Sequence, residues 1–352
     1  MSGLRSVAWY RPGHRAGGLP VSGPDEDAFT LAAEAIERSA EQARAPDGVA
    51  RLVLFGAVPS ELDWAFPVLL GYPVEIRHER ANPRTLLEAI DRENDDGAPA
   101  SLVVAVEYSP DSATSEVGSI TGTSGEGAVA FRLGPGGSPI EGSVRDRAAS
   151  SGSVLDAAFA LWPPLAETAP VDRSTGDGPV ARGPAEPPRA PELGAGTGPV
   201  LSAVSEGAYV PRPRYLENLP SRWRLRAERC DACGSLTFPA RGRCRSCQRS
   251  DRLRFEELPR RGARVIASTV IGPGGQPTEF DFQVARSGAY QVVLAELSPE
   301  ARITLPVTDG TPGGVRIGDR VDTSIRRLFP MEGEWRYGRK AVPLRTHDPT
   351  SF

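Results

Sequence analysis

All four cysteines of the chain lie in one stretch: Cys230-Asp-Ala-Cys233, then ten residues, then Cys244-Arg-Ser-Cys247. Two C-x-x-C pairs at this spacing allow four thiolates to converge on one tetrahedral metal ion. Gly234 follows the first pair, where a tight turn favours a residue with positive φ. Because protein ligands would fill all four coordination positions, the spacing predicts a structural zinc site, with iron as the alternative metal for four thiolates.

The composition is that of a soluble globular protein with more than one domain. Its 352 residues are 39% hydrophobic and 24% charged, and this length exceeds one ordinary core. The sequence has neither an apolar run long enough for a membrane span nor a signal-peptide core at its N-terminus. Together with thiols at metal-binding spacing, these features predict a cytoplasmic protein without a membrane partner. The formal net charge of −4 gives no general attraction to nucleic acid.

Residues 1–150 alternate strand-like and helix-like segments. Continuous apolar runs such as 51–55 and 101–106 are typical of strands that are covered on both faces. Helices are expected after the acidic run 25–27, where the macrodipole favours acidic side chains, from Ser60 to Leu70, and from Pro83 onward. The alternation predicts a layered α/β domain.

Residues 151–214 are rich in proline, glycine, alanine and serine, and this composition predicts a linker. At its start, Leu155 to Trp162 is expected to form a last helix that packs on the first domain.

The remaining chain is expected to form a short helix with a metal ribbon over 215–257 and a strand-rich domain over 258–352. Trp223 and Leu225 belong to the predicted helix. Four strand-like runs follow, at 264–270, 290–297, 302–307 and 320–328. Short strands separated by Gly/Pro turns favour a small Greek-key barrel.

This C-terminal part resembles the acyl-CoA-associated zinc-ribbon/OB-fold family over about Tyr215 to Pro343. The motifs that carry the resemblance are Cys230-Asp-Ala-Cys-Gly, Phe238-Pro-Ala-Arg, Gly262-Ala-Arg-Val-Ile-Ala-Ser-Thr, Tyr290-Gln-Val-Val-Leu-Ala-Glu-Leu and Ile317-Gly-Asp-Arg-Val. The resemblance implies a rubredoxin-like zinc ribbon followed by an all-β OB-fold barrel. It also implies a subunit or appended domain of a thiolase-type enzyme, placed near the acyl-CoA site of its partner.

The first domain resembles the N-terminal part of hydroxymethylglutaryl-CoA synthase and its thiolase-fold relatives. The motifs are Tyr10-Arg-Pro-Gly, Gly23-Pro-Asp-Glu-Asp-Ala-Phe-Thr, Ser101-Leu-Val-Val-Ala-Val-Glu and Gly125-Glu-Gly-Ala-Val-Ala-Phe. The resemblance implies a thiolase-like half-domain. Enzymes of this group acylate a cysteine, but the corresponding stretch, Glu79-Arg-Ala-Asn-Pro-Arg-Thr-Leu-Leu, contains none.

The chain has three histidines, His14, His78 and His347, and none lies in a recognisable catalytic context. We therefore expect no catalytic residue in this chain. The first domain is expected to keep the thiolase-like fold but to have lost its catalytic activity.

The leading hypothesis is a non-catalytic accessory or scaffold subunit of a thiolase-superfamily enzyme, in a hetero-oligomer that handles acyl-CoA. The expected zinc ligands are Cys230, Cys233, Cys244 and Cys247. Arg241, Arg243 and Arg245 lie in or beside the second cysteine pair and are candidates for contacts with the phosphates of CoA, because guanidinium groups suit phosphate. Acyl-CoA or CoA would reach this chain through the partner.

Two alternatives remain open. Residues 221–264 hold thirteen arginines against five acidic residues, as in an OB-fold protein that binds single-stranded nucleic acid. The second alternative is an acyl-CoA synthase or hydrolase active on its own, for which Ser112, Ser115 and Glu116 are the nearest candidates. No Gly-x-Ser-x-Gly motif accompanies them.

Overall fold

In the computed structural model the chain divides into two compact units, Met1–Val180 and Ala181–Phe352. The structure describes residues 2–42, 48–94, 99–108, 126–135 and 212–344, except for isolated positions, and seven residues between 148 and 161. Most of the predicted linker, 151–214, lies outside these residues, as do Ser112, Ser115, Glu116 and His347. No helix in the described part of the chain is long and apolar enough to cross a membrane.

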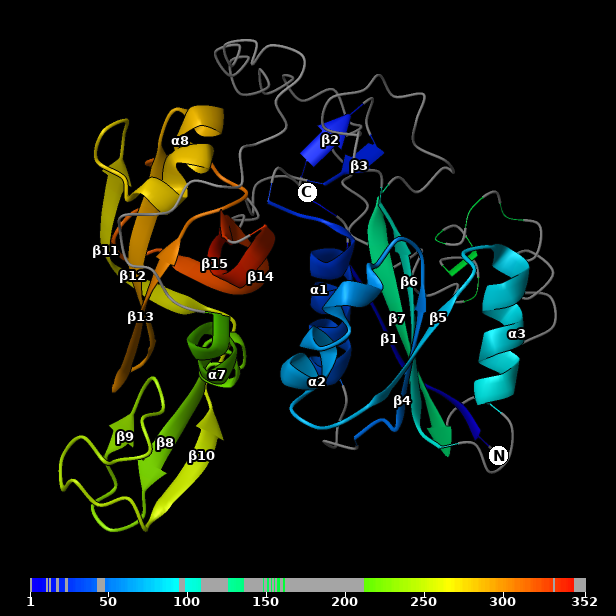
Figure 1. Ribbon diagram of the computed structural model, residues 1–352, viewed down its shortest axis with the longest axis horizontal. Helices are drawn as coiled ribbons and strands as arrows, with labels where there is room; N and C mark the ends of the chain where they lie inside the picture. Colours follow the sequence, from blue (N-terminus) through cyan, green and yellow to red (C-terminus); the bar gives the residue numbers. More distant parts are fainter. Residues whose placement is uncertain are drawn as a thin grey trace, which may run out of the picture. The chain divides into compact units, whose positions relative to one another are not determined.

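The first unit is built on a mixed five-stranded sheet with the order β1-β7-β6-β4-β5 (Figure 1). Strands β4, β5 and β6 run parallel, whereas β7 pairs antiparallel with both β6 and β1. The strands are β1 (Ser2–Tyr10), β4 (Arg51–Phe55), β5 (Glu75–Glu79), β6 (Ser101–Glu107) and β7 (Gly127–Pro135). A small hairpin of β2 (His14–Ala16) and β3 (Leu19–Val21) stands apart from this sheet.

Helices cover both faces of the sheet. Helices α1 (Ala28–Gln42) and α2 (Ala65–Leu70) lie on one face and α3 (Pro83–Glu93) on the other (Figure 1). Phe29 of α1 meets Phe66 of α2 edge to face, with ring centroids 5.4 Å apart. Because successive strand residues point to opposite faces, central strands with both faces covered must be apolar throughout. This explains the continuous runs and confirms the expected layered α/β architecture.

Local sequence signals set the helix starts. Asp27 accepts the Thr30 backbone N–H and Thr30 accepts the Asp27 backbone N–H, so the two residues cap α1 reciprocally. Asn82 caps α3 through the Thr85 N–H, with Pro83 in the first turn. The single helix expected from Ser60 to Leu70 is instead a 3-10 turn, η1 (Ser60–Leu62), followed by α2, and no side chain caps η1.

At the end of the first unit, Leu155, Ala157, Ala158 and Leu161 are buried in the core between the sheet and α3. These four residues belong to the segment expected to form a last helix, and their own burial agrees with the expected packing on the first domain.

The second unit begins with α7 (Arg212–Trp223) and a three-stranded ribbon sheet, order β10-β8-β9. Its strands are β8 (Arg226–Cys230), β9 (Leu236–Thr237) and β10 (Leu253–Glu257). The predicted helix ends at Trp223, so it does not include Leu225. Leu225 has a φ of 51° and is fully buried in the barrel core, where packing offsets an unfavourable backbone conformation.

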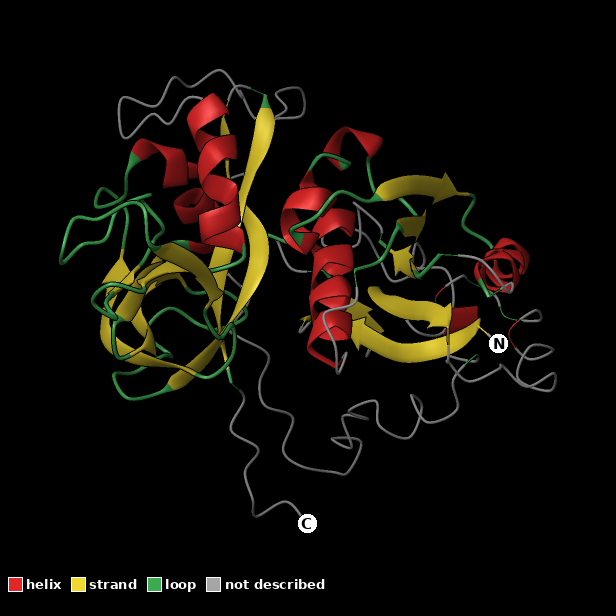
Figure 2. Cartoon of the chain, turned by 90° about the horizontal axis from the view of Figure 1, so that it is seen from below, coloured by secondary structure: helices red, strands yellow, loops and turns green. Residues whose placement is uncertain are grey.

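A five-stranded sheet of order β13-β12-β11-β14-β15 completes the second unit (Figure 2). A parallel bridge between Val307 and Ala341 joins the β13 end to β15 and closes the barrel. This closed Greek-key order is that of an OB-fold. The strands are β11 (Ala263–Ile271), β12 (Tyr290–Ser298), β13 (Ala301–Pro306), β14 (Arg320–Met331) and β15 (Glu334–Pro343), with η3 (Thr278–Phe280) and α8 (Asp281–Ser287) between β11 and β12.

Candidate metal centre

The four cysteine sulfur atoms meet at the tip of the ribbon, within 4.8 Å of one another. The Sγ atoms of Cys230 and Cys247 are 3.6 Å apart, and those of Cys233 and Cys244 are 3.5 Å apart. A tetrahedron with Zn–S bonds of about 2.3 Å has sulfur separations of about 3.8 Å, so these distances fit one metal ion. The structure therefore brings together the four residues that spacing alone had selected.

Two turns of the same design hold the cysteines. In the first, the Gly234 N–H donates to the Cys230 carbonyl at 2.7 Å and the Cys230 N–H donates to the Ser235 carbonyl at 3.0 Å. In the second, Gln248 and Arg249 repeat these two bonds with Cys244, at 3.1 and 2.9 Å. Each turn presents two thiols to the centre, as a zinc ribbon requires.

The residue after each cysteine pair has left-handed backbone geometry, with a φ of 75° at Gly234 and 63° at Gln248. Glycine adopts this conformation without steric cost, which confirms the expectation for Gly234. Gln248 takes the same conformation with a side chain, and nothing in the sequence had marked it.

Backbone N–H groups around the second turn stabilise the ionised form of its cysteines. Those of Cys247 and Ser246 lower the pKa of Cys244 to about 6. The Arg249 N–H also lowers the pKa of Cys247, but desolvation and the three neighbouring thiols outweigh it and raise that pKa to about 12. Four crowded thiols cannot all ionise on their own, and a divalent cation at their centre removes the conflict.

Residues 220–254, which contain all four cysteines, match the family described as "ChsH2, rubredoxin-like zinc ribbon domain". A curated relative, the "DUF35 domain-containing scaffold protein" of Methanothermobacter thermautotrophicus, is 32% identical over 133 residues. The match covers 94% of that protein and 37% of this chain. The chain belongs to the DUF35 family. The zinc of its ribbon is structural, since four thiols leave no open coordination position.

Solved structures also resemble this DUF35 chain over part of its length. One is an "Ltp2-ChsH2(DUF35) aldolase", 22% identical over 34% of this chain and 84% of the other, with a TM-score of 0.27. Another is PksG, an HMG-CoA synthase from Bacillus subtilis, 14% identical over 41% of this chain and 44% of the other, with a TM-score of 0.30.

The three arginines singled out near the second cysteine pair of the DUF35 ribbon differ in their surroundings. Arg245 is engaged: its Nη1 donates to the Glu300 carbonyl at 3.3 Å and its Nη2 lies 3.9 Å from the Glu300 carboxylate. Arg241 and Arg243 have exposed side chains that pair with no carboxylate among the described residues. The backbone N–H groups of Arg241 and Gly242 donate to the buried carboxylate of Glu228, which fixes the loop that carries these arginines.

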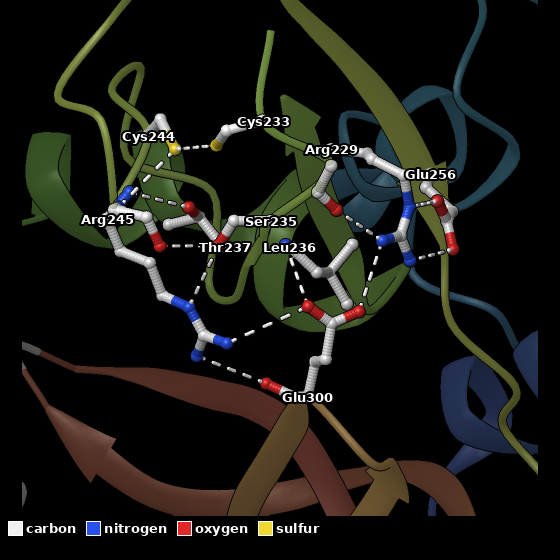
Figure 3. Close-up of polar contacts among 11 residues, drawn as sticks. Arg229, Cys233, Ser235, Leu236, Thr237, Cys244, Arg245, Glu256 and Glu300 are labelled. Carbon is white, nitrogen blue, oxygen red and sulfur yellow. Dashed lines mark hydrogen bonds and ion pairs between the residues drawn. The ribbon is translucent and has the colours of Figure 1, made fainter. Parts of the chain in front are cut away.

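Sequence reasoning missed the residue that joins the ribbon of this DUF35 chain to its barrel. Glu300 lies in the turn between β12 and β13, and its carboxylate accepts the Leu236 backbone N–H at 3.2 Å and the Arg229 guanidinium at 3.1 Å (Figure 3). Arg229 also forms a two-pronged bond with Glu256 of β10, at 2.7 and 3.2 Å. A glutamate in a surface turn carries no sequence signal for such a role.

These contacts lower the pKa of both carboxylates. The Leu236 N–H and then Arg229 hold the pKa of Glu300 below its usual value. The Arg229 hydrogen bonds likewise lower the pKa of Glu256. Both carboxylates therefore stay ionised at neutral pH. Glu300 joins the barrel to the ribbon, and Glu256 holds the same Arg229 guanidinium from within the ribbon.

Proposed function

We propose that this protein is a non-catalytic accessory scaffold subunit of a thiolase-superfamily enzyme. The observation that carries the proposal is the joining, in one chain, of a DUF35 ribbon and barrel to an α/β unit with motifs of acyl-CoA enzymes but without their nucleophile. Every cysteine of the chain lies in the metal cluster. No thiol is left to accept an acyl group, so a partner has to supply the chemistry.

The region where the nucleophile would be expected supports a structural role for the first unit. Helix α3 begins with the Asn82 cap and Pro83, and it is amphipathic: Leu86, Ala89 and Ile90 are buried, and Arg84 and Glu88 are exposed. His78 lies nearby on β5, where its Nε2 contacts the Asp63 carboxylate at 2.8 Å on the surface. These residues build and solubilise the unit, which would serve as a packing surface in a hetero-oligomer.

Within this proposal the zinc ion, held by Cys230, Cys233, Cys244 and Cys247, fixes the shape of the ribbon. The exposed guanidinium groups of Arg241 and Arg243 then supply positive charge for the phosphates of a CoA bound by the partner. The Glu228 anchor keeps their loop in one conformation, which lowers the entropic cost of that contact.

The charge distribution bears on the nucleic-acid alternative. Many arginines of residues 221–264 already pair with acidic side chains, which reduces the positive charge available to a phosphate backbone. The paired arginines are Arg224, Arg229, Arg245, Arg249, Arg254, Arg261 and Arg264.

The test is purification of the tagged full chain from its native host, followed by acyl-CoA turnover assays with and without the co-purified proteins. We expect a thiolase-superfamily subunit in the complex and turnover only when both are present. Recovery without such a subunit contradicts the scaffold role. Turnover by the isolated chain supports the stand-alone enzyme, and salt-sensitive binding of single-stranded DNA supports the nucleic-acid reading.

A double variant tests the proposed role of Arg241 and Arg243 separately. In the complex, Arg241→Gln with Arg243→Gln is expected to raise KM for acyl-CoA about tenfold with little change in kcat, because uniform binding energy is lost. Arg252→Gln, another exposed arginine of the ribbon, is the matched control. An equal KM in both variants excludes the phosphate contact but leaves the scaffold role intact.

A further inference from the structure

A second candidate site lies inside the C-terminal unit, away from the metal. A cavity of about 440 Å³ opens between α7, the Phe238–Pro239 segment of the ribbon, and the barrel strands β13, β14 and β15. This volume falls within the range of small-molecule sites, about 300–1,000 Å³. The cavity includes none of Arg241, Arg243 and Arg245, so it is separate from the contacts proposed for CoA.

The inner wall of the cavity is apolar. It includes Leu305 and Pro306 from β13, Leu328 and Phe329 from β14, and Phe280 from η3. The Phe280 ring meets Phe329 edge to face at 5.5 Å and stacks on Tyr290 at 5.4 Å. Aromatic contacts of this kind hold a wall in place, so the cavity is preformed for an apolar group.

The polar part of the lining has a single sign of charge. Five arginines and no carboxylate line the cavity, among the residues that the structure describes. The arginines are Arg214, Arg222, Arg302, Arg336 and Arg339. Arg214, Arg302 and Arg336 pair with carboxylates outside the lining. The lining itself carries one sign of charge and favours an anion.

Two of these arginines maintain the structure. Arg339 donates to the Trp223 carbonyl at 2.5 Å and to the Thr323 carbonyl at 3.1 Å. The Arg336 guanidinium lies 3.2 Å from Glu334 and 4.9 Å from the centre of the Tyr215 ring. These contacts fix the inner end of the site, so the positive charge available to a ligand has to come from other arginines of the lining.

The cation best placed for a ligand is Arg222, on α7. Arg214, Asn218 and Arg222 are spaced four residues apart and therefore share one face of the helix, at the cavity. Arg214 pairs with Glu217 at 2.6 Å, whereas Arg222 is exposed and pairs with no carboxylate among the described residues. Its guanidinium can form two parallel hydrogen bonds with a carboxylate.

We propose that this cavity binds an amphiphilic monocarboxylate, with a medium-length acyl chain against the apolar wall and the carboxylate at Arg222. Transfer of the chain from water to the wall stabilises the complex, and the charge stays at the rim, where it keeps part of its hydration. Binding is to this chain itself and does not depend on a partner subunit. The inference goes beyond the scaffold role, and either can fail while the other holds.

Calorimetric titration of the full zinc-loaded chain with decanoate, below its micelle concentration, tests the proposal. We expect saturable binding that weakens about tenfold in Arg222→Gln, which removes one charge-assisted contact. Arg316→Gln removes the same charge from an exposed turn that does not line the cavity, and it should bind as the native chain does. Asn218→Trp places an indole at the opening from an exposed helix position, and it should abolish binding.

Decanol, which has the same chain without the charge, is the ligand control and should bind about tenfold more weakly than decanoate. Circular dichroism of each variant shows whether the fold is kept, and both α7 positions are exposed, so we expect native spectra. Three results overturn the proposal: no saturable decanoate binding, equal binding of decanol, or equal affinity in Arg222→Gln and Arg316→Gln.

Discussion

Arg229 of the ribbon donates to the carboxylate of Glu300 in the barrel at 3.1 Å, across 71 residues of sequence. The same carboxylate accepts the backbone N–H of Leu236, the first residue of β9. The contact makes the stability of the ribbon depend on the barrel.

Glu300→Gln should lower the denaturant midpoint of the C-terminal unit at pH 7. Folding lowers the pKa of Glu300. The stabilisation that its carboxylate provides is therefore fully present above the ordinary pKa, near 4.5, and is lost as pH falls through the folded-state pKa. The difference between native and variant chains should therefore shrink at acidic pH. Glu217→Gln, which breaks an exposed pair on α7, is the control and should have little effect at either pH. A difference that does not change with pH contradicts the assignment.

Tyr215 connects α7 to β15 through hydrogen bonds with the backbone N–H and carbonyl of Tyr337. Its hydroxyl donates to the Tyr337 carbonyl at 3.0 Å and accepts the Tyr337 N–H at 2.9 Å. Tyr215→Phe leaves the Tyr337 N–H without this partner, while the carbonyl keeps the Trp223 indole N–H at 3.1 Å, and the change should cost about 1–3 kcal/mol of unfolding free energy. Tyr290 is also buried, but its hydroxyl bonds to no described residue. Tyr290→Phe should therefore be nearly neutral, and equal losses in the two variants would refute the explanation.

Alkaline unfolding gives an independent measure of the same tyrosine. Burial raises the pKa of Tyr215 to about 12, from an ordinary value of 10. The folded state therefore holds its proton more tightly, and stability is full below pH 10 and declines as pH rises toward 12. The decline should amount to roughly 2–3 kcal/mol. Burial also raises the pKa of Tyr290, so the measurement is the difference between the native chain and Tyr215→Phe. A decline of equal size in both would contradict the prediction.

The paired turns of the metal site predict opposite effects of two substitutions. Gly234→Ala places a side chain at a φ of 75° and should destabilise the ribbon by about 1 kcal/mol, although a Cβ there meets no atom within 4 Å. Gln248→Gly relieves the equivalent conformation in the second turn and should raise the denaturant midpoint. Zinc content by elemental analysis should be unchanged in both. Stabilisation by Gly234→Ala would refute the backbone argument.

Zinc removal should unfold the ribbon. Cys233→Ser is expected to lose one equivalent of zinc by elemental analysis and to lose cooperative unfolding of the C-terminal half, because metal affinity and folding are coupled. Ser246→Ala lies in the second turn, where the serine hydroxyl donates to Ser235 at 2.8 Å, and it should keep the metal. Retention of zinc by Cys233→Ser would mean that the four sulfur atoms do not form the complete ligand set.

The sequence predicted the metal site because ligand spacing is a local property: two pairs, each within one turn, need no knowledge of the tertiary structure. The same holds for the strands 51–55 and 101–106, whose apolar runs match β4 and most of β6. The barrel was predicted from four strands, and its fifth, β15, was not identified. Its segment, Glu-Trp-Arg-Tyr-Gly-Arg-Lys-Ala-Val-Pro, alternates polar and apolar residues only up to Tyr337, after which Gly338 and two cations interrupt the pattern.

Features that depend on distant contacts left no trace in the sequence. Leu225 was predicted to belong to the short helix before the ribbon, but it is buried in the barrel core with a left-handed backbone conformation. Glu300 reads as an ordinary turn residue. The cavity is lined by residues from α7, the ribbon, η3 and three strands, so its single-sign charge is visible only after folding.

The contacts between α7 and Tyr337 also set an order of events during synthesis. Tyr215 and Trp223 both bond to the backbone of Tyr337, which leaves the ribosome more than a hundred residues later. The bridge from Val307 to Ala341 likewise waits for the last strand. The helix at the start of the C-terminal unit therefore cannot dock until Tyr337 has emerged, and a nascent or truncated product that ends before Tyr337 exposes the apolar wall of the cavity to the quality-control machinery of the cell.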